Sequence, residues 1–347
     1  MLRRRTFLGA AAVGAASPLM SSTPALGSPR VGEVLAQDLQ VPWGLAFLPD
    51  GDALVGERPT GDVHRVRRTG GRSKIGTLTS VVDDGEGGLL GIAVGPGFAE
   101  DRWVYFYFTS ANDNRIVRRR YRNGSLGRTE VVLDGIPASS NHNGGRLAFG
   151  PDGMLYASTG DAGDTSRAQD KNSLGGKILR MTPSGGVPDG NPFDSRVWSY
   201  GHRNVQGLAW DADGRMWATE LGQNTRDELN RIRPGGNYGW PDVEGGDGDG
   251  PYADPFVTWS PTSSCSPSGV AIAGGRAWVG ALAGQALYSV RLGGPNRRRK
   301  VRHLGDRFGR IRTVEKAPDG SLWITTSNRD GRGDPVATDD RVIRINL

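Results

Sequence analysis

A histidine between two amides is the side chain of this sequence best suited to moving a proton. It lies in residues 141–146, NHNGGR, where a pair of glycines lets the backbone come close to a bound molecule. The next residues, 147–156, read as a strand, a Pro-Asp-Gly turn and a second strand, so His142 is expected on a loop at the edge of a sheet. Because an imidazole titrates near neutral pH, His142 could act as a base facing a cleft.

A second polar loop has the same relation to a sheet. Residues 201–204, GHRN, also introduce a strand–turn–strand unit. The recurrence predicts that polar groups from successive repeats converge on one centre.

One short pattern recurs along the chain and must position these loops. It consists of an apolar triplet, a turn of the Pro-Asp-Gly type and a strand rich in aromatic or β-branched residues. The spacing between copies, 44 to 62 residues, is typical of propeller blades with insertions. The copies begin at Leu45, Ile92, Leu147, Leu208, Val270 and Val314.

Six copies predict an all-β fold, a six-bladed β-propeller, formed by residues 28–347 as a single domain. A strand at 341–346 is expected to share a blade with the first strand, near 31–39, and so to close the ring. The long insertions at 159–175, 183–206 and 220–266 are expected on the faces of the propeller, where binding chemistry usually lies.

The first 27 residues read as a leader rather than as part of the fold. Paired arginines at Arg4 and Arg5 precede a short apolar run, and small residues follow up to Gly27. This pattern is typical of a twin-arginine signal peptide, with a Sec-type leader as the alternative. We therefore expect export to the periplasm or the medium, and no transmembrane segment in the mature chain.

Charge and cysteine content narrow the classes of partner. The formal charge is +6, and removal of three leader arginines leaves 6 − 3 = +3, too little to predict a nucleic-acid partner. The single cysteine, Cys265, cannot form an intrachain disulfide and is expected to be a packed residue rather than a nucleophile.

Five motifs occur in one order along the chain and together resemble those of a known family. They are 86–91 (EGGLLG), 141–146 (NHNGGR), 160–161 (GD), 201–207 (GHRNVQG) and 236–241 (GNYGWP). They are similar to the motifs of the soluble glucose/sorbosone dehydrogenases, which include aldose sugar dehydrogenases that use pyrroloquinoline quinone (PQQ). The resemblance implies a six-bladed propeller that oxidises a small sugar at its anomeric carbon by hydride transfer to PQQ. It also implies an external electron acceptor.

The resemblance assigns roles to individual residues. It makes His142 the general base, Asp161 the acid that orients it, and Arg203 a group that stabilises charge on the quinone. The positions matching cofactor contacts are Glu86, Arg203, Asn204, Ser264, Arg310 and Arg312.

A calcium ion is also implied by the resemblance. Backbone carbonyls of Gly222 and Gln223 match a loop that holds calcium against the cofactor, and Glu228 and Tyr238 match calcium ligands of some members. Calcium prefers oxygen donors of these kinds.

Two departures from the family pattern bear on cofactor affinity. Residues 279–284 carry no lysine where tight-binding members have one, and Glu86 places a negative charge where an amide is usual. Two other functions therefore stay open: a non-enzymatic propeller that binds a glycan or a protein, and a calcium-dependent propeller lactonase. The sequence does not identify the sugar, the electron acceptor or the oligomeric state.

Overall fold

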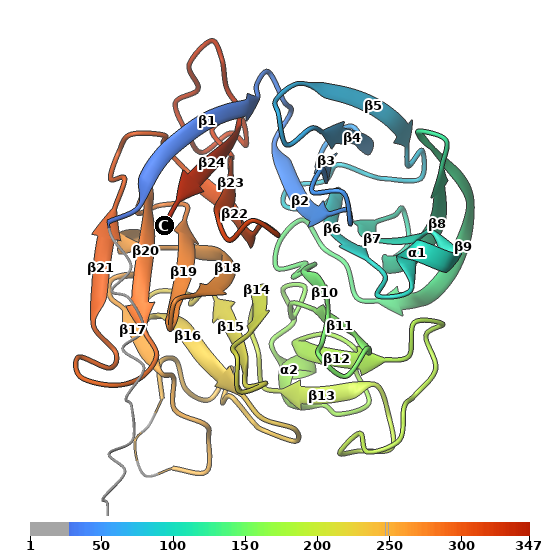
Figure 1. Ribbon diagram of the computed structural model, residues 1–347. Helices are drawn as coiled ribbons and strands as arrows, with labels where there is room; N and C mark the ends of the chain where they lie inside the picture. The colour runs from blue at the N-terminus through green and yellow to red at the C-terminus, as the bar shows by residue number, and fades with distance from the viewer. Residues whose placement is uncertain (1–27, 247, 249) are drawn as a thin grey trace, which may run out of the picture.

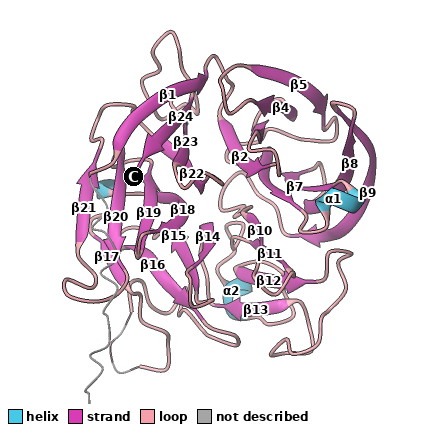
Figure 2. Cartoon of the chain, viewed as in Figure 1, coloured by secondary structure: helices cyan, strands magenta, loops and turns pink. Residues whose placement is uncertain are grey.

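The apolar triplet of each of the six repeats lies on the innermost strand of a four-stranded antiparallel sheet. In the computed structural model, which describes residues 28–246, 248 and 250–347, six such sheets stand around a central axis (Figure 1). Nearly all of the regular structure is strand, joined by loops (Figure 2). The predicted six-bladed β-propeller is confirmed, and the expected leader, 1–27, lies outside the described residues.

Five blades take their strands in chain order from the axis outward. They are β2 (Pro42–Phe47), β3 (Ala53–Glu57), β4 (Asp62–Val66) and β5 (Arg72–Thr77); β6 (Leu89–Val94), β7 (Trp103–Thr109), β8 (Asn114–Arg122) and β9 (Ser125–Ile136); β10 (Leu147–Phe149), β11 (Leu155–Ser158), β12 (Lys177–Met181) and β13 (Val197–Tyr200); β14 (Val205–Trp210), β15 (Met216–Glu220), β16 (Asp227–Ile232) and β17 (Val257–Trp259); and β18 (Pro267–Ala273), β19 (Arg276–Ala281), β20 (Ala286–Arg291) and β21 (Lys300–His303).

The sixth blade combines the two ends of the described chain. Its inner strands are β22 (Ile311–Lys316), β23 (Leu322–Thr326) and β24 (Val342–Asn346), and its outer strand is β1 (Arg30–Ala36). β1 pairs antiparallel with β24, so the strand expected to close the ring does so.

The helices are single turns: α1 (Phe98–Asp101), α2 (Ser166–Gln169) and the 3-10 turn η1 (Thr262–Ser264). In the described part of the chain, no helix has the length and apolar character needed to cross a bilayer.

In five of the six blades, a small residue on the first strand faces a large residue on the second. The middle residue of the apolar triplet pairs with a buried large residue on the second strand, and in five blades that middle residue is alanine. The small side chain leaves room for the large one beside it, which keeps the sheet evenly filled. The pairs are Ala46–Leu54, Ala93–Tyr105, Ala148–Tyr156, Ala209–Trp217, Ala271–Trp278 and Glu315–Trp323.

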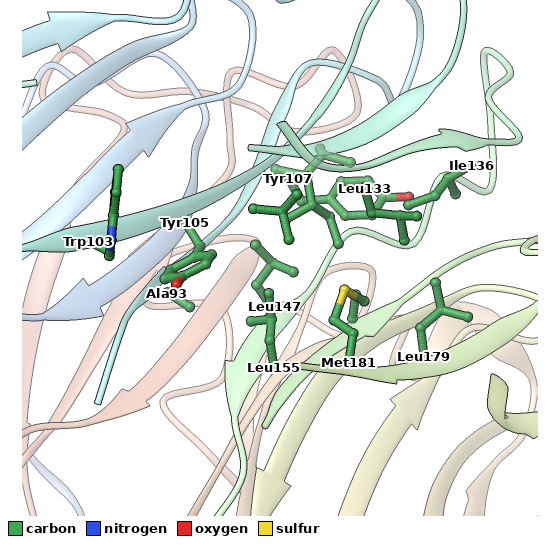
Figure 3. Close-up of a cluster of buried hydrophobic side chains, with 14 of the residues drawn as sticks. Ala93, Trp103, Tyr105, Tyr107, Leu133, Ile136, Leu147, Leu155, Leu179 and Met181 are labelled. Atoms are coloured by element: carbon green, nitrogen blue, oxygen red, sulfur yellow. The ribbon is translucent and has the colours of Figure 1, made fainter. Parts of the chain in front are cut away.

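The cores lie between neighbouring blades. Figure 3 shows Tyr105 and Tyr107 of β7 facing Leu155, Leu179 and Met181 of the next blade. All of these side chains are buried, and burial of this kind contributes roughly 1.5–3 kcal/mol for each large apolar side chain. The blades are therefore held rigidly enough to fix the loops between them.

The axis of the ring is filled by one arginine. Gly44 and Gly91 precede their triplets where inner strands come close, and a Cβ there would lie 2.4 Å from the Leu90 carbonyl oxygen or 2.2 Å from that of Gly145. Arg146 occupies the equivalent position in its blade, and its guanidinium crosses the axis to donate to the Thr313 hydroxyl at 3.2 Å. The channel is thereby divided into two ends.

Candidate active site

A cavity of about 230 Å³ opens at the end of the channel where the inner strands begin. The second residues of three inner strands contribute Trp43, Gln206 and Arg312 to its wall. The rest of the wall comes from loops: Arg58, Gly85, Glu86, Asn143, Gly144, Leu221, Leu282, Asp330, Gly331 and Arg332. The loops of several blades therefore meet at one polar site, as the recurrence of polar motifs predicted.

His142 stands beside this wall with one ring nitrogen held by a buried acid. Its Nδ1 lies 2.7 Å from Oδ1 of Asp161, whose side chain is fully buried. A carboxylate can only accept here, so Nδ1 carries the proton and the neutral ring keeps a lone pair on Nε2. This is the tautomer that a base needs.

Asp161 is held in its charged form by three donors. Burial alone would raise its pKa, but hydrogen bonds from His142, the Gly163 N–H and the Trp240 indole outweigh burial and lower the pKa below its usual range. A permanently ionised carboxylate stabilises a charged imidazole beside it. Asp161 is therefore placed both to orient His142 and to support its protonation.

The backbone of His142 is constrained as tightly as its ring. Its φ is +54°, in the left-handed region that non-glycine residues rarely adopt. The Glu86 carboxylate accepts from the His142 N–H at 3.1 Å, and the His142 carbonyl oxygen lies where a Cβ at Gly160 would be, 1.8 Å away. Gly160 and Glu86 together fix the conformation that aims the imidazole.

Arg203 and Asn204 connect the histidine loop to the next blade. Asn204 accepts from the Gly144 N–H at 3.1 Å, and the Arg203 carbonyl accepts from the Asp161 N–H at 2.9 Å. The guanidinium of Arg203 lies 5.5 Å from the ring centroid of Trp240, the indole that holds Asp161. Its buried Nε–H has no partner among the described residues, so this donor is free for a ligand.

Arg310 and Arg312 lie on one side of the strand start, as their spacing predicted. Both contact Oδ2 of Asp330, at 3.0 Å and 3.3 Å, and Arg312 also donates to the Gln206 side chain at 3.0 Å. Burial lowers the pKa of Arg312 to about 10, which still leaves it charged at neutral pH. Two buried cations sharing one carboxylate leave a net positive site for an anion.

Glu86 does not leave an unbalanced charge in the cavity. Arg332 donates to its carboxylate at 2.9 Å, and this pairing outweighs burial to lower the pKa of Glu86. Arg58 and Arg332 both line the wall, and neither was identified from the sequence. They supply cations in a site that lacks the family lysine.

The residues matching a calcium site are placed around the 222–226 loop. Four consecutive backbone N–H groups, from Gln223 to Arg226, donate to one oxygen of Glu244 at 2.9 to 3.0 Å. The Gly222 carbonyl accepts from Arg203 at 2.8 Å, so it faces the cavity side of the loop. A cation bound there would compete with one hydrogen bond of Arg203.

Glu228 and Tyr238 lie deeper in the same blade. Burial and the neighbouring Glu220 raise the pKa of Glu228 to about 8. The Tyr238 hydroxyl donates to the Arg231 carbonyl at 2.7 Å, and its ring stacks on His202. Burial therefore disfavours the charged form of Glu228, and the Tyr238 hydroxyl is committed to the backbone.

Ser264 and Cys265 lie away from this cavity. Ser264 is in η1, where its hydroxyl donates to the Pro261 carbonyl at 2.7 Å. Cys265 is fully buried in the core between two blades, as expected of a packed residue. Burial raises the pKa of its thiol, which removes nucleophilic character.

Three relatives place this geometry among known proteins. The model of the family described as Glucose / Sorbosone dehydrogenase matches residues 39–337. The structure of the PQQ-bound form of Aldose Sugar Dehydrogenase from Streptomyces coelicolor is 50% identical, with a TM-score of 0.89 over 94% of this chain and 99% of that one. Aldose sugar dehydrogenase YliI of Escherichia coli is 30% identical over 86% of this chain and 90% of the relative. Quinoprotein glucose dehydrogenase B of Acinetobacter calcoaceticus is 34% identical, over 64% of this chain and 54% of the relative.

Proposed function

The chain belongs to the glucose/sorbosone dehydrogenase family, and on that premise we propose that it oxidises aldose sugars at the anomeric carbon, with PQQ as hydride acceptor. The observation that carries the proposal is the His142–Asp161 pair beside an arginine-lined cavity. Such a reaction requires a base beside a positively charged anion site.

The chain's own residues account for the proton. His142 Nε2 takes the proton of the anomeric hydroxyl, because Nδ1 is occupied by Asp161. The resulting imidazolium is stabilised by the ionised Asp161 carboxylate, which Trp240 and Gly163 keep in place. The carbon can then lose hydride as the carbonyl of a lactone forms.

The cavity fits an anionic quinone by its donor set. When bound, PQQ accepts the hydride from the sugar carbon. Arg312 and Arg310 would hold its carboxylates by exchanging part of their contact with Asp330. The unpartnered Nε–H of Arg203 would donate to a quinone oxygen.

Calcium would bind through the Gly222 and Gln223 carbonyls of the loop ordered by Glu244, where it would polarise the quinone. A second calcium at Glu228 would displace the carboxyl proton, since a metal-bound carboxylate must be ionised. Both sites are proposals that rest on oxygen donors already at hand.

Residues 1–27 are proposed to direct export by the twin-arginine route, so the enzyme acts in the periplasm or the medium and passes its electrons to an external acceptor. Cell fractionation tests this location: replacing Arg4 and Arg5 with lysine should leave the protein in the cytoplasm.

A calcium-dependent lactonase is disfavoured by the charges in the cavity. The two acids in the cavity wall, Glu86 and Asp330, are each paired with an arginine and do not converge on a common centre.

The direct test is reconstitution of residues 28–347 with PQQ and calcium, followed by dye reduction with a panel of aldoses. We expect turnover that needs both added PQQ and sugar. PQQ binding without turnover of any aldose would contradict the sugar chemistry, whereas failure to bind PQQ would favour the non-enzymatic propeller.

A further inference from the structure

A second cluster of ionisable side chains lies in the first blade, outside the central cavity. Glu57 ends β3, Asp62 begins β4, and His64 follows two residues later. One ligand atom from each of the three side chains lies within 4.8 Å of the others. None of the three has a part in the proposed sugar oxidation.

The strand register forces two carboxylates together. Gly56 pairs with Val63, and the Gly61 N–H donates to the Glu57 carbonyl across the turn, so Glu57 and Asp62 face each other at the end of the hairpin. Like charges directly opposite on paired strands are unfavourable unless a cation lies between them. Glu57 is buried, so its charge needs compensating donors or a cation.

His64 brings one ring nitrogen close to this pair. Its side chain is 9% exposed, and Nε2 lies 3.4 Å from Oε1 of Glu57. Neither ring nitrogen has a hydrogen-bond partner among the residues the structure describes. A buried imidazole without partners is unusual, because nearly all buried polar groups are satisfied.

The surrounding donors already orient both carboxylates. Thr60 donates to Glu57 at 3.1 Å and Thr77 to Asp62 at 2.6 Å, contacts of the kind that position metal ligands from outside. Two cations also reach the cluster: Lys74 Nζ lies 2.7 Å from Asp62, and Arg72 Nη1 lies 3.5 Å from Glu57. The Lys74 side chain is 51% exposed, so it can turn outward when another cation binds.

We propose that Glu57, Asp62 and His64 form a binding site for a divalent first-row transition metal such as zinc. One imidazole and two carboxylates are ligands that zinc accepts, with water completing its shell. Calcium is excluded as the preferred ion because it takes oxygen ligands only. The inference goes beyond the proposed function and does not depend on it.

One residue of the proposed site, Glu57, is the chain neighbour of Arg58 in the wall of the central cavity. Arg58, the neighbour of Glu57, donates to Asp83 and to the Gly85 and Gly87 carbonyls at 2.6 to 2.8 Å. It thereby holds the loop that presents Glu86 to the cavity. A metal at the end of the β3–β4 hairpin would fix the base of Arg58 and stiffen this wall.

The test is calorimetric titration of zinc into metal-free mature protein, residues 28–347. We expect one tight site in the wild type, and a loss in His64→Ala greater than the roughly tenfold to hundredfold that an outer partner of a metal site costs. His303→Ala, which removes an imidazole from a different blade, should bind zinc as the wild type does. Equal zinc binding by the wild type and His64→Ala would overturn the site.

A variant that improves binding separates a metal site from a merely structural cluster. Lys74→Ala removes the competing cation and should tighten zinc binding by about twofold to fivefold, the scale of an exposed ion pair. Weaker binding in this variant would contradict the proposal. Calcium titrated in place of zinc should bind these three residues much more weakly, and equal affinity would contradict the assignment of the metal class.

Thermal unfolding gives a second measurement of zinc binding, which also shows whether each variant is folded. Asp62→Asn removes one carboxylate ligand together with its ion pair to Lys74, so the melting temperature of this variant without metal serves as its own baseline. Excess zinc should raise the melting temperature of the wild type by several degrees and leave this variant unchanged. An equal rise in both would overturn the proposal.

Discussion

The two ends of the central channel are made by the same six inner strands and differ in every property that matters for chemistry. At the other end, which we call the triplet end, a hollow is lined by the repeated triplets, from Leu45–Phe47 of β2 to Val270–Ile272 of β18, with Glu315 and Lys316 as the only ionisable side chains in its wall. At the open end, the second residues of three of these strands, Trp43, Gln206 and Arg312, lie in the cavity wall, and charged loops complete it. One half of each strand serves packing and the other half presents the site.

Arg146 keeps the two ends apart. Its guanidinium lies 4.2 Å from the ring centroid of Trp43 and donates to the Gln206 carbonyl at 2.9 Å. Burial lowers its pKa to about 10, so a positive charge persists beneath the open cavity at neutral pH. The charged groups of the candidate site therefore lie where the repeated triplets give way to loops.

The largest expected effect tests whether proton transfer belongs to the open end alone. His142→Asn should lower kcat by about 10²–10⁴-fold, because the base is lost while asparagine tolerates the left-handed backbone. Steady-state dye reduction by reconstituted enzyme measures it. Lys316→Ala, at the triplet end, is the matched control and should keep the wild-type rate. A His142→Asn enzyme of normal rate would remove this residue from the mechanism.

The next prediction concerns the shared acid of the open end. Asp330→Asn should lower the free energy of unfolding by about 3 kcal/mol, because Arg310 and Arg312 lose the carboxylate that compensates them. Chemical denaturation measures the loss, and bound PQQ should reduce it by offering other carboxylates.

The pH dependence of that loss has a defined sign. Burial raises the pKa of Asp330, but Arg312 and Arg310 outweigh it and lower the pKa. Its stabilisation is therefore complete above the unfolded pKa of about 3.9 and is lost as pH falls further. The wild type and Asp330→Asn should converge below about pH 4. A gap that stayed constant at all pH values would contradict the ion pair.

A smaller effect is expected on the affinity of the cofactor. Arg312→Ala removes a charged donor, which should weaken PQQ binding by about 1.5–3 kcal/mol, or roughly tenfold to a hundredfold. Titration of activity with PQQ measures this. Arg291→Ala, on a strand of another blade far from the cavity wall, should leave the affinity unchanged. Equal affinity in Arg312→Ala would place the carboxylates elsewhere.

The smallest effect is a loss of stability that should be confined to the triplet end. Phe47 packs edge-on against Trp323 with ring centroids 4.9 Å apart. Phe47→Leu should cost about 1 kcal/mol of stability with kcat and PQQ affinity unchanged. Thermal unfolding and dye reduction on the same sample separate the two. A fall in kcat would show that the ends are coupled through the strand.

The sequence was sufficient to predict the ring because its signals are local. Turn residues and triplets mark each blade within about ten positions, and the pairing of β1 with β24 follows once six blades are counted. The spacing of Arg310 and Arg312 likewise fixes their common side without knowledge of distant contacts.

The partners of the site residues could not be found in the same way. Asp330 reaches Arg310 from a loop in its own blade, Trp240 reaches Asp161 from 79 positions along the chain, and Arg332 reaches Glu86 from 246 positions away. These pairings depend on loop conformations that carry no periodic signal. Arg332 pairs with Glu86 and so offsets the negative charge that the sequence places in the site.

The shared blade of β1 and β24 has a consequence for how the protein is made. A ribosome finishes β1 long before β24, so the first strand must wait unpaired while five blades are synthesised. Arg310 and Arg312 belong to that last blade. The pocket that we propose for the quinone is therefore completed only when the last blade has been synthesised.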